Sequence, residues 1–74
     1  MTIYKNIKQN LLDVAKEVKL HNPKDKAYCR YVINNEADEC SRRLDWYAMK
    51  GKLTEKQAEQ RKLWLHSYAA DLHP

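Results

Sequence analysis

The chain reads Lys50-Gly51-Lys52-Leu53-Thr54-Glu55-Lys56-Gln57 at the point that decides its fold. Thr54 and Gln57 have the spacing of a capping box, in which each side chain satisfies a free backbone N–H group at a helix start. Gly51 is the only glycine in the chain and stands where a left-handed residue would end the preceding helix. A helix end followed so closely by a helix start predicts an antiparallel helical hairpin.

The helix that follows the capping box is expected over residues 55–72. Leu53 and Ala58 are placed to form a hydrophobic staple around its first turn. The apolar residues of this segment share one face, flanked by Trp64, and they are Ala58, Leu65, Tyr68, Ala69 and Leu72.

The segment before Gly51 predicts one long helix over about residues 24–50. Asn22 is the expected N-cap, Pro23 suits the first helical position, and Asp25 adds negative charge to the first turn. Residues 34–35 are both Asn, so a kink or frayed turn there is the alternative to an unbroken helix. The apolar residues fall within about 100° of arc on a helical wheel, and they are Cys29, Ile33, Ala37, Cys40, Leu44, Tyr47 and Ala48.

The N-terminal segment predicts another amphipathic helix. Thr2 is its expected N-cap, and Pro23 should stop it near Leu20 or His21 because the residue before a proline disfavours helical geometry. Its buried stripe covers roughly 80° of arc and consists of Ile3, Ile7, Leu11, Val14 and Val18. The sequence therefore predicts an all-α, three-helix fold in which the central helix is unusually long.

Length and composition limit the remaining possibilities. The 74 residues make one small domain, expected to span 1–74. No apolar run approaches the ~18–20 residues that span a bilayer, and the first five residues do not open a signal peptide. One Gly and two Pro offer little turn chemistry for a β-fold, and two cysteines are too few for a disulfide scaffold. We expect a soluble, cytoplasmic protein without membrane association.

The cysteines and histidines do not predict a metal or redox site. Cys29 and Cys40 lie three turns apart on one helix face, at a separation of ~16 Å, which is too far for a disulfide. Buried thiols acting as small hydrophobic groups are the expected outcome. His21, His66 and His73 have no i,i+4 pairing with each other or with a cysteine. We therefore expect no metal and no cofactor.

Catalytic motifs are also missing from the sequence. It contains no nucleophile elbow, no phosphate-binding Gly loop and no paired carboxylate–histidine spacing. So small a chain also has difficulty enclosing a dry pocket. The expectation is a protein that is not an enzyme.

Aromatic residues on the long helix suggest a surface for a partner. Tyr28, Val32 and Trp46 form a second apolar strip about 100° from the main stripe, and Tyr31 lies on another side. Trp and Tyr are favoured at interfaces, so the strip is either a partner surface or a self-association surface. The alternative is that the two outer helices clasp the central helix from both sides and bury both strips. The sequence leaves these alternatives open.

Arg61 occupies an unusual place in the middle of an apolar arc. A charge there must reach solvent along its stem, pair with a carboxylate such as Asp45 or Asp38, or stack on an aromatic ring. The functional alternative is that Arg61, Trp64 and Tyr68 form a binding site for an acidic or phosphorylated ligand.

A basic face on the first helix supports a second hypothesis. Lys5, Lys8, Lys16 and Lys19 project within about 80° of each other, nearly opposite the apolar stripe, and Arg30 follows in the next helix. Residues 1–37 carry seven basic and four acidic side chains. Such a face either binds the phosphates of a nucleic acid or is only the solvent-exposed side of an amphipathic helix. No nucleic-acid recognition motif accompanies it.

The sequence thus favours a small helical interaction protein that binds and modulates another macromolecule. The expected contact residues are Tyr28, Tyr31, Trp46, Arg61 and Trp64. Compact chains of this kind are common among phage and mobile-element regulators or inhibitors of host machinery, which is an expectation from size alone. The alternatives are a nucleic-acid-binding accessory factor that uses the basic face and a structural homo-oligomer.

Overall fold

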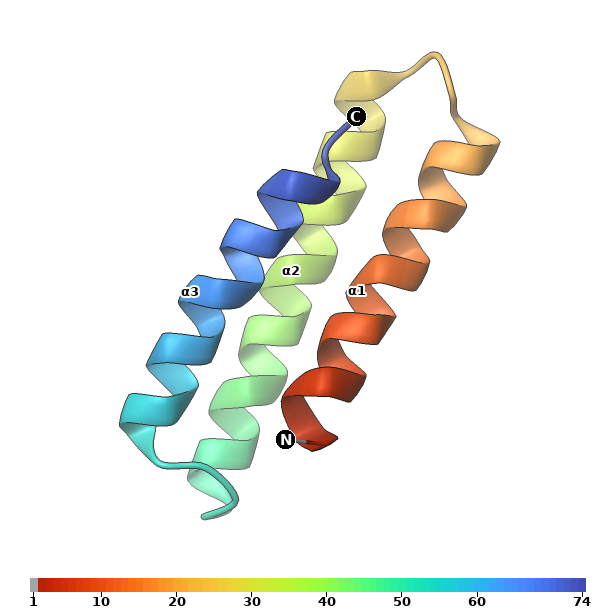
Figure 1. Ribbon diagram of the computed structural model, residues 1–74. Coiled ribbons are helices and arrows are strands. Elements are labelled where there is room, and N and C mark those ends of the chain that lie inside the picture. The colour runs from red at the N-terminus through yellow and green to blue at the C-terminus, as the bar shows by residue number, and fades with distance from the viewer. Residues whose placement is uncertain (1) are drawn as a thin grey trace.

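The computed structural model describes residues 2–74 and contains three helices. These are α1 (Thr2–His21), α2 (Lys26–Met49) and α3 (Glu55–Leu72). Figure 1 shows them as three roughly aligned rods joined by short connections at opposite ends. The molecule is elongated, with extents of 42 × 17 × 15 Å. The predicted all-α, three-helix arrangement is confirmed, with α2 as its longest and central element.

The predicted hairpin between α2 and α3 is confirmed in detail. Gly51 has a φ of 78°, and its N–H donates to the carbonyl of Ala48 at 3.1 Å. The next N–H, of Lys52, reaches back to the carbonyl of Tyr47 at 2.9 Å, which completes a Schellman motif. Thr54 and Gln57 form the reciprocal capping box, with both hydrogen bonds at 3.0 Å. The backbone at both helix ends is therefore satisfied locally, so α3 can fold back along α2.

The connection between α1 and α2 corrects the prediction for the start of α2. Asp25 is the N-cap, and its carboxylate accepts the N–H of Tyr28 at 3.0 Å, so the helix begins at Lys26. Asn22 instead serves the end of α1, because its side-chain amide donates to the carbonyl of Val18 at 3.1 Å. Pro23 lies in the turn between the helices. At the other end of α1, Thr2 is already helical rather than a flanking cap.

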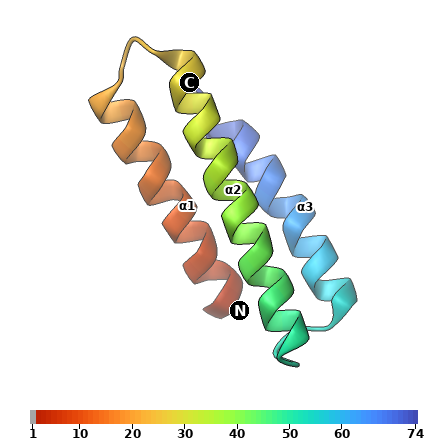
Figure 2. The same cartoon turned by 180° about the vertical axis from the view of Figure 1, so that it is seen from behind.

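Helix α2 runs without a break through Asn34 and Asn35, so the alternative of a kink there is excluded. Both other helices pack against α2, and they contact each other much less (Figure 2). The buried core consists of Ile7, Leu11, Ala15, Val18, Cys29, Ile33, Ala37, Cys40, Leu44, Leu53, Ala58, Leu65 and Ala69. Every one of these side chains is apolar, so the charged residues all remain at least partly exposed.

Both thiols are buried at the contact between α1 and α2, as predicted. The Cys29 thiol lies 3.6 Å from the carbonyl oxygen of Val18, and the Cys40 thiol lies 3.9 Å from that of Ile7. Burial raises the pKa of Cys40 to about 11, and nearby Glu36 adds to the effect. The Cys40 thiol is therefore protonated, and not poised to react, at neutral pH.

Candidate binding groove

A groove of about 300 Å³ lies where α1 and α3 face each other. We call it the α1–α3 groove; α1 and α3 line it with Tyr4, Lys8, Trp64, Ser67, Tyr68 and Asp71. Tertiary packing places these residues together, because α1 and α3 contact each other only along their flanks while both rest on α2. The groove therefore lies along the seam whose two helices contact each other least.

Aromatic rings supply much of the groove surface. The rings of Tyr4 and Trp64 meet edge to face, with centroids 6.0 Å apart and an interplanar angle of 67°. Trp64 is nevertheless 47% exposed. Partial burial raises the pKa of Tyr4, while the nearby Arg61 guanidinium opposes that shift. An indole that packs against one neighbouring ring and stays about half exposed leaves apolar surface for another molecule.

Arg61 stacks on this indole instead of pairing with a carboxylate. Its guanidinium carbon lies 5.7 Å from the Trp64 ring centroid. Nη1 donates to the carbonyl of Gln57 at 3.3 Å, while Nε is buried with no acceptor. No carboxylate among residues 2–74 lies within ion-pair distance of this guanidinium. Of the three outcomes that the sequence leaves open, stacking on an aromatic ring is the one observed.

The carboxylates that seemed available to Arg61 are engaged by its neighbours on α3. Asp45 pairs with Lys62 at 2.9 Å, and Glu59 pairs with the same ammonium at 2.7 Å. Asp38 lies 4.0 Å from His66. Pairing of Arg61 with Asp45 or Asp38, one of the three predicted alternatives, is therefore wrong, because positions 62 and 66 point toward α2 whereas position 61 points toward α1.

The lysine face of α1 is divided by its contacts with α3. The Lys8 ammonium lies 4.4 Å from the centre of the Tyr68 ring, and Lys19 donates to the carbonyl of Leu72 at 3.0 Å. Lys5 and Lys16 remain exposed. The predicted position nearly opposite the apolar stripe is wrong for two of the four lysines. Burial of Ala15, together with the Tyr4 contact, extends the packed face toward them.

The remaining sequence-predicted contact residues lie away from the groove. Tyr31 is 62% exposed on α2. Trp46 is half exposed, and its ring meets the Tyr47 ring edge to face and the Lys50 ammonium at 5.6 Å. Tyr28 lines a separate apolar hollow of about 280 Å³ near the connection of α1 and α2. The structure thus brings Arg61 and Trp64 together and leaves Tyr28, Tyr31 and Trp46 on other surfaces.

The three residues of the second apolar strip of α2, Tyr28, Val32 and Trp46, differ in how far they are buried. Val32 is partly buried and packs against the core, whereas Tyr28 and Trp46 stay about half exposed. The outer helices clasp α2 mainly through its principal stripe. Arg30, from the predicted basic set, is exposed on α2.

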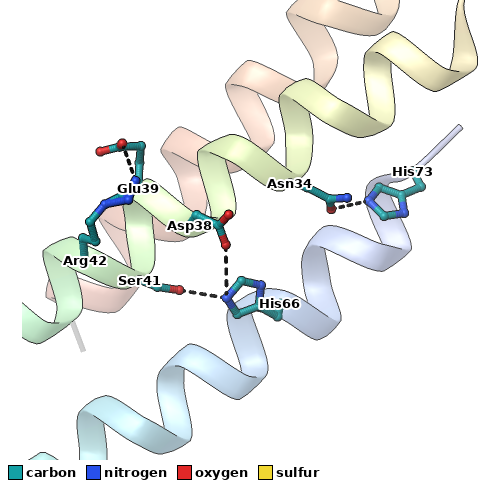
Figure 3. Close-up of polar contacts among 7 residues, drawn as sticks. All are labelled: Asn34, Asp38, Glu39, Ser41, Arg42, His66 and His73. Atoms are coloured by element: carbon teal, nitrogen blue, oxygen red, sulfur yellow. Dashed lines mark hydrogen bonds and ion pairs between the residues drawn. The ribbon is translucent and has the colours of Figure 1, made fainter.

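Polar side chains contact each other along the opposite seam, between α2 and α3 (Figure 3). Ser41 contacts Nε2 of His66 at 3.0 Å, and Asp38 approaches the same nitrogen at 4.0 Å. A Ser–His–Asp relay needs the acid on the other ring nitrogen, so this trio lacks the arrangement for nucleophile activation. His73 meets Asn34 at 2.8 Å further along the seam. These contacts tie α3 to α2.

A larger hollow of about 500 Å³ lies near Gly51, between α2 and α3. It is lined by Asp45, Ala48, Met49, Glu55, Ala58 and Glu59. Lys62 already pairs with two of its three carboxylates, and Glu55 lies in the first turn of α3, where the helix dipole favours a negative charge. Lys62 and the start of α3 thus offset part of the negative charge of this hollow.

Sequence reasoning missed Tyr4 as a groove residue. No signal within α1 alone could have identified it, because its role depends on the register between α1 and α3.

Within the described part of the chain, no three His, Cys, Asp or Glu side chains gather closely enough to hold a metal ion. No helix of residues 2–74 combines the length and apolar character needed to cross a bilayer.

Comparison of the chain with protein-family models, with curated proteins and with solved structures found no match, so the geometry described above is the basis for the function proposed below.

Proposed function

We propose that this protein is a non-enzymatic interaction protein that binds another protein through its preformed helical surface and modulates it. The observation that carries the proposal is the contact of Arg61 with the indole of Trp64, which lines the α1–α3 groove. Trp and Arg are enriched among residues that dominate binding energy, particularly beside apolar pockets. A regulator or inhibitor encoded by a phage or mobile element fits the size of the chain and belongs to the same proposal.

The exposed residues of α2 form a second candidate surface. Tyr28, Tyr31 and Trp46 retain apolar area that the core does not use, so they stay predicted contact residues. They do not share a hollow with Trp64, and one small partner would engage one of the two surfaces.

The test is affinity measurement with a partner captured by the tagged protein from cells of its source. We expect Trp64→Ala to weaken binding by roughly tenfold, in line with a loss of more than ~1.4 kcal/mol at an interface hot spot. Leu63→Ala is the matched control, because Leu63 is 72% exposed and adjacent in sequence. Equal affinities of both variants and the wild type would contradict a role for the groove.

Nucleic-acid binding through the basic face remains the competing proposal. It is weakened by the internal contacts of Lys8 and Lys19, which leave Lys5 and Lys16 as the more accessible lysines of the set. Salt-sensitive binding to generic DNA or RNA that is abolished by charge reversal at Lys5 and Lys16, and unaffected by Trp64→Ala, would favour this alternative.

A structural homo-oligomer is the third proposal, since the exposed aromatic residues also suit self-association. Sedimentation velocity over a concentration series tests it. A monomer at every concentration would exclude it and leave the binding of a different molecule.

A further inference from the structure

Two cations, Lys8 in the α1–α3 groove and Arg61 beside it, lack acidic partners in the described part of the chain. Lys8 and Arg61 both face aromatic rings, at 4.4 and 5.7 Å, and neither has a carboxylate within ion-pair distance among residues 2–74. Asp71 is the single carboxylate that lines the groove, so Lys8 and Asp71 in the lining, together with Arg61 beside Trp64, leave one net positive charge. The polar seam between α2 and α3 differs, because there Lys62 takes two carboxylates.

Arg61 is also prepared for an acceptor. Contact with the indole and the hydrogen bond to Gln57 hold the guanidinium before any ligand arrives. An arginine fork placed in this way loses less conformational freedom when it binds a carboxylate than a free lysine would. Nε–H is buried and closed to a ligand, and Nη1 donates to Gln57, so Nη2 is the nitrogen with no hydrogen bond among the described residues and is the donor left for a carboxylate.

The rings specify the rest of the ligand. Tyr4, Trp64 and Tyr68 offer apolar faces and edges beside the two cations. A carboxylate next to a large apolar side chain matches both features at once. A phosphate backbone fits less well, because it needs a continuous track of free cations, and two of the four lysines on α1 are engaged internally.

We infer that the α1–α3 groove binds an acidic segment of a partner protein, in which Arg61 receives an Asp or Glu carboxylate and Trp64 packs against an adjacent apolar side chain. This inference rests on the proposed function and adds the chemistry of the partner to it. Lys8 provides the second positive charge, at the Tyr68 end of the groove.

Nuclear magnetic resonance with the ¹⁵N-labelled full chain tests the inference. The probes are a short peptide in which Glu alternates with Leu, the same peptide with Lys in place of Glu, and an oligothymidylate. We expect the Glu peptide to shift the indole N–H of Trp64 and the Nε–H of Arg61, and to leave the indole of Trp46 unmoved. The Lys peptide should shift neither residue of the groove.

Variants separate a specific receptor from general charge attraction. Arg61→Gln should weaken binding of the Glu peptide about tenfold or more, as expected for loss of a charge-assisted hydrogen bond. Arg42→Gln makes the same charge change on the exposed surface of α2, where Arg42 pairs with Glu39, and should have little effect. Arg61→Lys keeps the charge but not the fork, so it should bind less well than the wild type.

The outcomes also separate this inference from the proposed function. Failure of the Glu peptide to bind, equal losses in Arg61→Gln and Arg42→Gln, or groove shifts produced equally by the oligothymidylate would overturn it. If the peptide instead shifted Trp46 and left Trp64 unmoved, the inference would fail while protein binding through α2 still stood.

Discussion

The two seams along α3 differ in how they treat charge. Toward α2, polar groups pair within the chain: Lys62 with Asp45 and Glu59, and His73 with Asn34. Toward α1, by contrast, cations lie over aromatic rings, and a half-exposed indole borders an open groove. Helix α3 therefore pairs its charges with groups of the chain on the side of α2, and on the side of α1 it leaves cations without an acidic partner among the described residues.

This difference separates stability from recognition along adjacent positions. Lys62 and Leu65 face α2 and the core, while Trp64 lines the groove and Arg61 contacts its ring. Matched charges inside a chain have little left to offer a partner, whereas ring-stacked cations keep both their charge and their donors. Substitution of Arg61 or Trp64 should therefore weaken partner binding more than it reduces the free energy of unfolding.

The largest expected effect separates the neighbouring residues Leu65 and Trp64. Leu65 is fully buried, so Leu65→Ala should reduce the free energy of unfolding by about 2–5 kcal/mol. Trp64→Ala removes a larger side chain, but one that is 47% exposed, and should reduce it less. Urea denaturation of both variants measures the difference. A loss for Trp64→Ala equal to that for Leu65→Ala would assign the indole to the core and contradict the comparison.

The contact between α1 and α2 contains the buried thiol of Cys40, whose ionisation makes the stability of the fold depend on pH. The pKa of Cys40 rises from 9.0 to about 11 on folding. Above pH 9 the unfolded chain loses this proton while the folded chain retains it, so stability falls as pH rises toward 11. The slope contributed is at most about 1.4 kcal/mol per pH unit.

Cys40→Ala isolates this contribution, because all other titrating groups remain. We expect the variant to lose stability less steeply between pH 9 and 11 than the wild type, as measured by urea denaturation at each pH. Parallel curves for the two proteins would show that the thiol ionises equally in both states.

The hairpin that closes the α2–α3 seam depends on Gly51. Its φ of 78° is unfavourable for residues with a Cβ, although the space around that position is open. Gly51→Ala should therefore reduce stability by about 1–2 kcal/mol through the backbone alone. Gly51→Asn is the matched variant and should be less destabilising, because Asn tolerates the left-handed region. Identical unfolding midpoints for Ala and Asn would argue against a conformational cause.

The smallest expected effect concerns the polar contacts of the α2–α3 seam. Lys62→Met should reduce stability by about 0.2–1 kcal/mol, because Asp45 and Glu59 are largely solvated. Salt should narrow the difference from the wild type. Lys56→Met is the control, since Lys56 is exposed and makes no ion pair among the described residues. A salt-independent loss would mean that the lysine stem matters more than its charge.

Much of this architecture was predictable because its signals are local. The Gly51 cap and the Thr54–Gln57 box predict the hairpin, the end of α2 and the start of α3. The start of α2 was misplaced because Asn22 and Asp25 are both good caps within four residues, and their hydrogen bonds decide between them.

The groove was less predictable because it depends on register between helices. Arg61 stood out as a charge within an apolar arc, and Trp64 and Tyr68 were grouped with it. Their α1 partner Tyr4 could not be identified from one helix. The lysine face was misplaced because Ala15, a small residue with a weak hydrophobic signal, contributes to the buried face of α1.

The most direct test of the account is acrylamide quenching of tryptophan fluorescence with and without the captured partner. Trp46→Phe leaves Trp64 as the only tryptophan, and Trp64→Phe leaves Trp46. Both indoles are about half exposed in the free protein, so both should be quenched there. The account predicts that the partner shields Trp64 and leaves the quenching of Trp46 unchanged. Shielding of Trp46 while Trp64 stays accessible would contradict it.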